Sequence, residues 1–169
     1  MIKIAKKLSL TDVNKLDSKL NEMKTIYLND GDFKLDVYIK FRDTKISRLL
    51  LDFQEAFEVL RKETVSYNQV QNMMLLSQML ILKQFTNLGL EKLDMSKKED
   101  LYKLFNIAEK LVDTGIYEQI FEQFEKDELE KINKAIEQSN QMGKQIGEIM
   151  ASAINHEKIK GEDNAEGLH

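Results

Sequence analysis

The sequence contains no cysteine and no proline, and only two histidines in 169 residues. Without cysteine the chain has no disulfide, no thiol nucleophile and no cysteine metal ligand. Proline breaks helices, so its absence agrees with long helices, but abundant Lys, Asn, Ile and Glu favour an AT-rich genome as the cause. His156 and His169 both lie in a polar segment where a general base or metal ligand would lack a fixed partner.

Long apolar runs and one-sided charge are also missing. The longest apolar stretch, residues 73–82, is interrupted by Ser77 and Gln78 and is far shorter than the ~20 residues of a membrane span. The basic N-terminus is not followed by an apolar region, so we expect no signal peptide. The net charge of −4 comes from interleaved acidic and basic residues, which argues against nucleic acid as a partner.

No motif of an enzyme or a cofactor site is present. Phosphate-binding glycine loops, nucleophile elbows and zinc-protease helices are all absent. The turn 29–32 is too short for a calcium loop. A run of carboxylates is typical of a solvated helix face, with an acidic docking patch as the alternative: Glu118, Glu122, Glu125, Asp127, Glu128 and Glu130. We therefore expect no enzyme, cofactor or metal site; a magnesium enzyme built on Asp and Glu alone is the minor alternative.

Strict alternation of apolar and polar residues over 33–41 is typical of a half-buried strand. Asp30-Gly31 precedes it and follows a second short apolar segment, which predicts a β-hairpin near 24–41. A lone hairpin is marginally stable in water. We expect it to pack on helices or to pair with a strand elsewhere, including one from another subunit.

The rest of the chain has helical periodicity. The predicted helices cover 12–23 after Thr11, 44–63 from Thr44, 66–87 from Ser66, a segment opened by a capping box at Ser96 and Glu99, 116–124, and 127–155. The helix 66–87 is apolar nearly all round, so it should be the central one. The predicted fold is mainly α, a multi-helix bundle with a small N-terminal β-hairpin and a long C-terminal helix. We expect one domain over 1–155 and a disordered, flexible tail over 156–169.

A narrow apolar stripe with small residues follows the last predicted helix. We call its residues the C-terminal stripe and predict that they bind protein: Leu129, Ile132, Ile136, Gly143, Ile146 and Met150. Their spacing of three and four residues is typical of close helix–helix contact. Contact within the fold and contact between subunits explain the stripe equally well.

Residues 81–152 carry a family resemblance in the phrases ILKQFTNLGLE from Ile81 and LVDTGIYEQIFEQF from Leu111, followed by a long acidic-to-polar helix. This part resembles the small tail assembly chaperones of long-tailed, siphovirus-type phages and prophages. The resemblance implies a non-enzymatic, self-associating protein of the bacterial host cytoplasm that binds the tape measure protein and delivers it to tail tube proteins. The alternative is a helical adaptor or regulatory protein of a mobile element that acts as a homo-oligomer.

Overall fold

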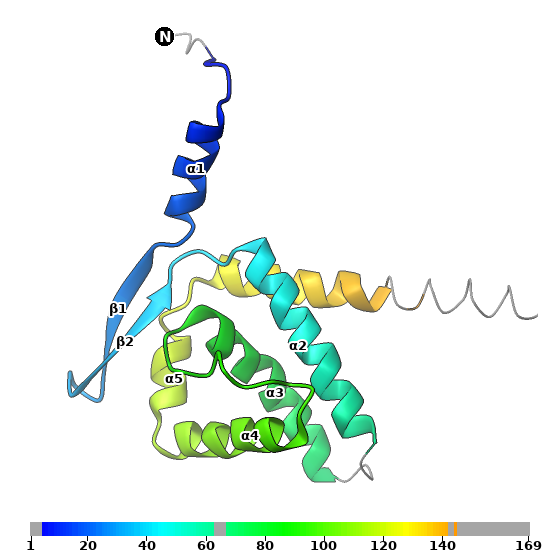
Figure 1. Cartoon of the computed structure of the whole chain (residues 1–169). Coiled ribbons are helices and arrows are strands. Elements are labelled where there is room, and N and C mark those ends of the chain that lie inside the picture. The colour runs from blue at the N-terminus through cyan, green and yellow to red at the C-terminus, as the bar shows by residue number, and fades with distance from the viewer. Residues whose placement is uncertain (1–4, 63–66, 142–143, 145–169) are drawn as a thin grey trace, which may run out of the picture. The chain divides into compact units, whose positions relative to one another are not determined.

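A computed structural model describes residues 5–62, 67–141 and 144, with side chains of the third helix from residue 75 onward. Its elements are shown in Figure 1: α1 (Leu10–Lys19), β1 (Met23–Leu28), β2 (Phe33–Tyr38), α2 (Asp43–Arg61), α3 (Tyr67–Phe85), α4 (Lys98–Asp113), α5 (Ile116–Phe121) and an unlabelled helix over 126–141. The predicted mainly α fold with an N-terminal hairpin is confirmed. The predicted tail, 156–169, lies outside the described residues.

The chain divides into two compact units, Met1–Lys131 and Ile132–His169. The first holds every labelled element and the first turns of the last helix. The second contains the remaining described part of that helix, up to residue 141. Among the described residues, no helix combines the length and the apolar character needed to cross a membrane.

The hairpin forms where the sequence predicts it. β1 and β2 are antiparallel, with Ile26 opposite Leu35, and both of these side chains are buried. Asn29 and Asp30 adopt positive φ angles of 50° and 55°, and Gly31 follows at 97°, so residues that tolerate left-handed backbone make the tight turn.

The predicted alternation of buried and exposed side chains over 33–41 is present only in the middle of this segment. Phe33, beside the turn, is exposed, and β2 ends at Tyr38 rather than at residue 41. Phe41 leaves the sheet and stacks on Phe85 of α3, with ring centroids 3.8 Å apart. Because the Phe41 ring packs on α3, the strand ends earlier than the alternation predicts.

The helical core is centred on α3, as its nearly uniform apolar character predicts. Its second half contributes side chains with no exposed surface: Leu76, Met79, Leu80, Leu82 and Phe85. α2 and α4 each turn one apolar stripe inward and contact α3.

Residues just after α3 extend the hairpin. Val37 forms an isolated antiparallel bridge with Thr86. The Asn87 backbone N–H donates to the Asp36 carbonyl at 3.1 Å, and the Asn87 side-chain oxygen accepts the Asp36 N–H at 2.9 Å. The middle of the outer edge of β2, at Asp36 and Val37, is therefore bonded within the chain. The hairpin also contacts α5, so packing on a helix, one of the two expected arrangements, is present.

The predicted helix caps are wrong at three positions. Ser9, not Thr11, caps α1 in a capping box with Asp12. Ser96 does not cap α4, which begins after Lys97, because its hydroxyl and N–H both bond the Asp94 carboxylate. α2 begins one residue before Thr44, with Arg42 at the N-cap and no side-chain cap bond.

Candidate protein-binding surfaces

The C-terminal stripe is only partly within the described residues. Ile132 is buried, and Leu129 and Ile136 are half-buried. Gly143, Ile146 and Met150 lie outside the described part of the chain. The stripe therefore remains a prediction.

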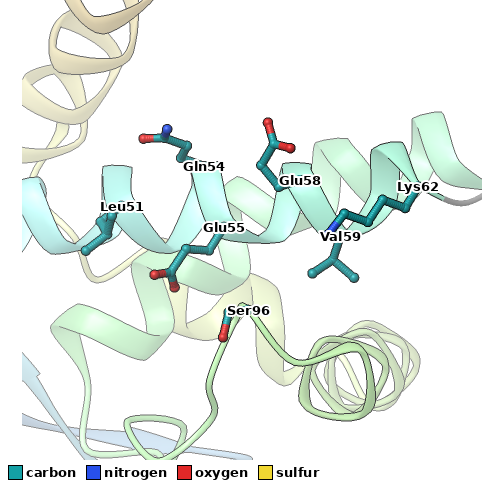
Figure 2. Close-up of a pocket in the computed structure, with 7 residues that line it drawn as sticks. All are labelled: Leu51, Gln54, Glu55, Glu58, Val59, Lys62 and Ser96. Atoms are coloured by element: carbon teal, nitrogen blue, oxygen red, sulfur yellow. The ribbon is translucent and has the colours of Figure 1, made fainter.

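A hollow of about 240 Å³ runs along one side of α2 and reaches the loop before α4 (Figure 2). We call it the α2 hollow, and its lining residues are Leu51, Gln54, Glu55, Glu58, Val59, Lys62 and Ser96. Cofactor pockets commonly measure about 300–1,000 Å³ and enclose their ligand. The size and open position of the α2 hollow suit a side chain from another protein better than a cofactor.

The charged residues of the α2 hollow differ in whether they have an ion-pair partner. Glu58 pairs with Arg61 at 2.8 Å. Glu55 and Lys62, two helical turns apart, have no ion-pair partner among the described residues. Leu51 is 54% exposed between these polar groups. The hollow therefore offers an apolar contact, a carboxylate and an ammonium group along one helix face.

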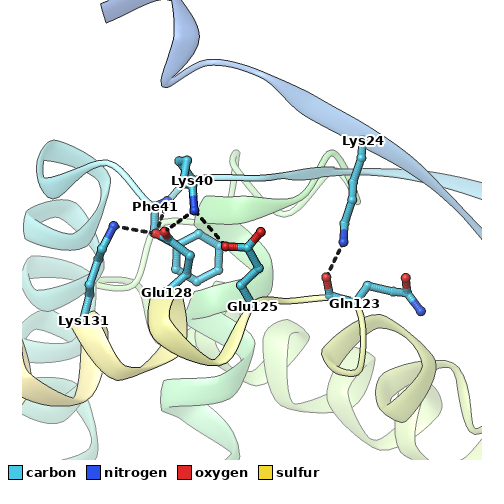
Figure 3. Close-up of polar contacts among 7 residues, drawn as sticks. All are labelled: Lys24, Lys40, Phe41, Gln123, Glu125, Glu128 and Lys131. Carbon is cyan, nitrogen blue, oxygen red and sulfur yellow. Dashed lines mark hydrogen bonds and ion pairs between the residues drawn. The ribbon is translucent and has the colours of Figure 1, made fainter. Parts of the chain in front are cut away.

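Sequence reasoning missed the buried carboxylate of Glu128, at the start of the last helix (Figure 3). Its Oε2 accepts the Phe41 backbone N–H at 2.8 Å and the Lys131 ammonium at 2.7 Å. Its Oε1 pairs with Lys40 at 3.1 Å, and Lys40 also bonds Glu125 at 2.7 Å. This Glu128 cluster ties the first turn of the last helix to the segment between β2 and α2.

The surroundings of Glu128 act on its charge in opposite directions. Burial raises the pKa of its carboxyl group. Hydrogen bonds from Lys131, the Phe41 N–H and Lys40 favour the charged form and lower the pKa below its ordinary value overall. An ionised, fully bonded carboxylate is a poor proton donor or acceptor near neutral pH, so we interpret Glu128 as an anchor.

The other carboxylates of the predicted acidic face are exposed, as expected: Glu118, Glu122, Glu125, Asp127 and Glu130. Glu128 is the exception, because helix periodicity turns it inward toward Phe41 and Lys40. A single carboxylate at a buried helical position within an acidic run is a signal that the sequence does carry. Only the partners that satisfy its charge come from distant segments.

α5 and the turn after it form hydrogen bonds with the hairpin. The Lys24 ammonium donates to the Gln123 carbonyl at 2.6 Å (Figure 3). The Gln119 side chain accepts the Asn29 backbone N–H at 2.8 Å and donates to the Asn29 side chain at 3.1 Å. The phrase from Leu111 to Phe124, singled out by its resemblance, thus contains the residues that position the hairpin.

α1 presents large apolar side chains without burying any of its residues. Leu10 and Leu16 are 80% and 60% exposed, and Val13 and Leu20 are also exposed. Arg42 holds the end of this helix through Asp17 and Asn21. A contiguous apolar helix face of this kind is typical of a surface that another protein covers.

Within the described residues, no group of three or more His, Asp or Glu side chains is arranged to hold a metal ion. His156 and His169 both lie outside that part of the chain. Among the described residues, the candidate surfaces are the α2 hollow and the α1 face.

The fold and these surfaces define a mainly helical protein with an N-terminal hairpin and exposed apolar faces. A family model described as YomO matches residues 10–167. The chain therefore belongs to the YomO family, whose name is associated with phages and prophages. No curated protein and no solved structure matched the chain.

Proposed function

We propose that this protein is a non-enzymatic, protein-binding tail assembly chaperone. It binds the tape measure protein in the cytoplasm of the bacterial host and passes it to the tail tube proteins. Membership of a phage-associated family supports this proposal. So does the resemblance of residues 81–152 to such chaperones. The α2 hollow is the observation that carries it, because it offers a client a contact surface outside the core.

The client contact is an amphipathic helix laid along α2. One apolar side chain of that helix enters the hollow beside Leu51 and Val59. A basic side chain pairs with Glu55, and an acidic one, about two turns away, pairs with Lys62. The α2 hollow requires only one apolar side chain between opposite charges, and many amphipathic helices carry this pattern. Such tolerance suits a chaperone that holds a long client at many places.

Co-expression with the tape measure protein encoded by the same phage or prophage tests this function. Leu51→Gln removes the apolar contact without adding charge. Burying a leucine contributes about 1.5–3 kcal/mol, so client affinity should fall by about tenfold or more. Val112→Gln is the matched control, since Val112 is an exposed apolar residue on α4 with 48% exposure. Affinity is measured by titration of the purified variants with a labelled client segment.

Equal client binding by both variants would remove the α2 hollow from the mechanism. No binding of the tape measure protein by the wild-type chain would contradict the chaperone function itself. The second candidate, a helical adaptor or regulatory protein of a mobile element that acts as a homo-oligomer, is favoured by the exposed face of α1. A tape measure gene next to the gene for this chain would favour the chaperone.

A further inference from the structure

β1 has an outer edge whose backbone groups face away from the hairpin. The Ile39 N–H donates to the Glu22 carbonyl at 3.1 Å, so this pair is bonded across the ladder. Bonded and non-bonded pairs alternate in antiparallel sheets. The following bonded positions on β1 are Lys24, Ile26 and Leu28, and the backbones of Met23, Thr25 and Tyr27 face outward.

The pairing of Asp36 supports this assignment independently. Its backbone N–H and carbonyl are both used by Asn87, on the side away from β1. Thr25 is its partner in the ladder, so the Thr25 backbone faces away from β2. Among the described residues, the outward groups of Met23, Thr25 and Tyr27 have no hydrogen-bond partner. The two edges of the hairpin therefore differ: Asn87 bonds the middle of the β2 edge at Asp36, whereas no described residue bonds the β1 edge from Met23 to Tyr27.

An open edge is self-complementary when a two-fold axis brings two copies together. Only outward-facing residues can bond, so the symmetric registers are centred on Lys24, Thr25 or Ile26. The first places two Lys24 side chains opposite each other, which is unfavourable. The third places Met23 opposite Asn29, whose N–H already bonds Gln119.

The register centred on Thr25 uses every outward residue. Thr25 pairs with Thr25 of the second copy, and Met23 pairs with Tyr27, giving about six new backbone hydrogen bonds. Met23 and Tyr27 are both exposed and lie on the same face of the hairpin, so each covers the other. Lys24 then faces Ile26, and no like charges oppose each other along β1.

The ends of the strand are complementary in charge as well. In this register the segment before Met23 runs beside the turn of the second copy. The residue that ends α1 just before this segment, Lys19, is basic, whereas the turn carries Asp30 and Asp32. α1 ends shortly before β1 begins, and its exposed apolar side chains would add apolar area that two strands alone do not supply.

We propose that β1 pairs with β1 of a second copy, antiparallel and centred on Thr25, to form a four-stranded sheet, with α1 contributing to the interface. This interface is separate from the α2 hollow and does not depend on the identity of any client. An extended segment of another protein added to the same edge is the competing arrangement.

Single cysteines test the register, because the chain has none of its own. Thr25→Cys places two cysteines with Cα atoms about 5.5 Å apart across the axis, within the range of a disulfide. Mild oxidation should convert most of this variant to covalent dimers. Lys34→Cys is the control: Lys34 is exposed on the same face of the sheet, but the two Lys34 residues of the dimer would lie about 20 Å apart, three strand spacings across the sheet and four residues along it.

A mixture of Met23→Cys and Tyr27→Cys should cross-link, whereas each variant alone should not. Cross-linking of Thr25→Cys no faster than Lys34→Cys would overturn the proposal, as would efficient cross-linking of Met23→Cys alone.

Thr25→Pro tests the hydrogen bonds directly. It removes an outward N–H that the hairpin does not use, so the fold should survive, as judged by circular dichroism. Sedimentation should show dimers for the wild type and for Thr25→Ala, but monomers for Thr25→Pro. A wild-type monomer at all concentrations, or a dimeric, folded Thr25→Pro, would overturn the proposal. If Thr25→Pro fails to fold, the cross-linking result decides. Loss of dimers with client binding retained would leave the chaperone function standing, and Leu51→Gln should show the reverse.

Discussion

Glu128 illustrates how one side chain joins segments that are far apart in the sequence. Its carboxylate is 2% exposed and is bonded by the Phe41 backbone, Lys40 and Lys131. A buried charge is costly unless its partners satisfy it, and here each of its oxygens has at least one donor. Phe41, which donates to it, also stacks on Phe85, so the charge cluster and the aromatic core share a residue.

Glu128→Gln keeps the shape of this side chain but removes its charge. We expect the free energy of unfolding at pH 7 to fall by about 1–3 kcal/mol, since hydrogen bonds to a charged group are weakened. Glu128 has a lowered pKa in the folded chain, so its contribution is present above the unfolded pKa and is lost as pH falls through the folded value. The difference between variant and wild type should therefore shrink in acid.

Urea unfolding at a series of pH values measures this difference. Glu125→Gln is the control, because Glu125 also pairs with Lys40 but its side chain is 52% exposed. Its effect should stay below about 0.5 kcal/mol. Equal losses for the two variants would mean that burial of Glu128 has no special effect.

Among the elements, α1 and α3 represent opposite cases. α3 is apolar nearly all round and supplies fully buried side chains to the core. α1 is a short helix with a capping box and no buried residue. Short helices are marginal in water without packing, so α1 depends on its cap and on whatever covers its apolar face. We therefore expect α1 to unfold locally without unfolding of the core.

Ser9→Ala removes the cap of α1. We expect a local loss of about 1 kcal/mol, seen as roughly fivefold faster amide hydrogen exchange over Leu10–Lys19. The midpoint of global unfolding should not change, because no core residue lies in α1. Ser96→Ala is the matched control at α4, where Ser96 is not the cap. Faster exchange throughout the core in Ser9→Ala would show that α1 is coupled to the rest.

At the scale of the whole molecule, the hairpin connects the surfaces that the proposals use. Its β2 edge is joined to the end of α3 through Asn87, and its buried face is held by α5 and the following turn. Its β1 edge remains open, next to the apolar α1. The α2 hollow lies on different residues, so client binding and self-association do not compete for the same side chains.

Dimer formation through β1 should make thermal stability depend on concentration. A partner that binds only the folded chain stabilises it by mass action. Over a hundredfold range of protein concentration, we expect the wild-type Tm to rise by about 3–6 °C. Scanning calorimetry of Thr25→Pro should show a Tm that does not move. A wild-type Tm independent of concentration would argue against a dimer linked to folding.

Local sequence patterns determined most of the secondary structure of this protein. The alternation around Leu35 and Val37 and the Asp30-Gly31 turn predicted the hairpin, because strand faces and tight turns depend on neighbouring residues. Apolar periodicity predicted the helices and the central place of α3 for the same reason. Caps were less predictable: Ser96 belongs to a turn in which its N–H and hydroxyl donate to Asp94, and α4 begins only after Lys97.

Tertiary structure alone decided which polar groups are paired and which edges are open. Burial of Glu128 depends on Phe41, Lys40 and Lys131 meeting around it. Phe41 leaves the strand because Phe85, more than forty residues away, offers it a stacked contact. The fold brings Asn87 to the edge of β2 at Asp36, whereas it brings no described residue to the outer edge of β1. These outcomes depend on contacts between distant segments, and no local pattern encodes the position of a partner that the fold has yet to bring close.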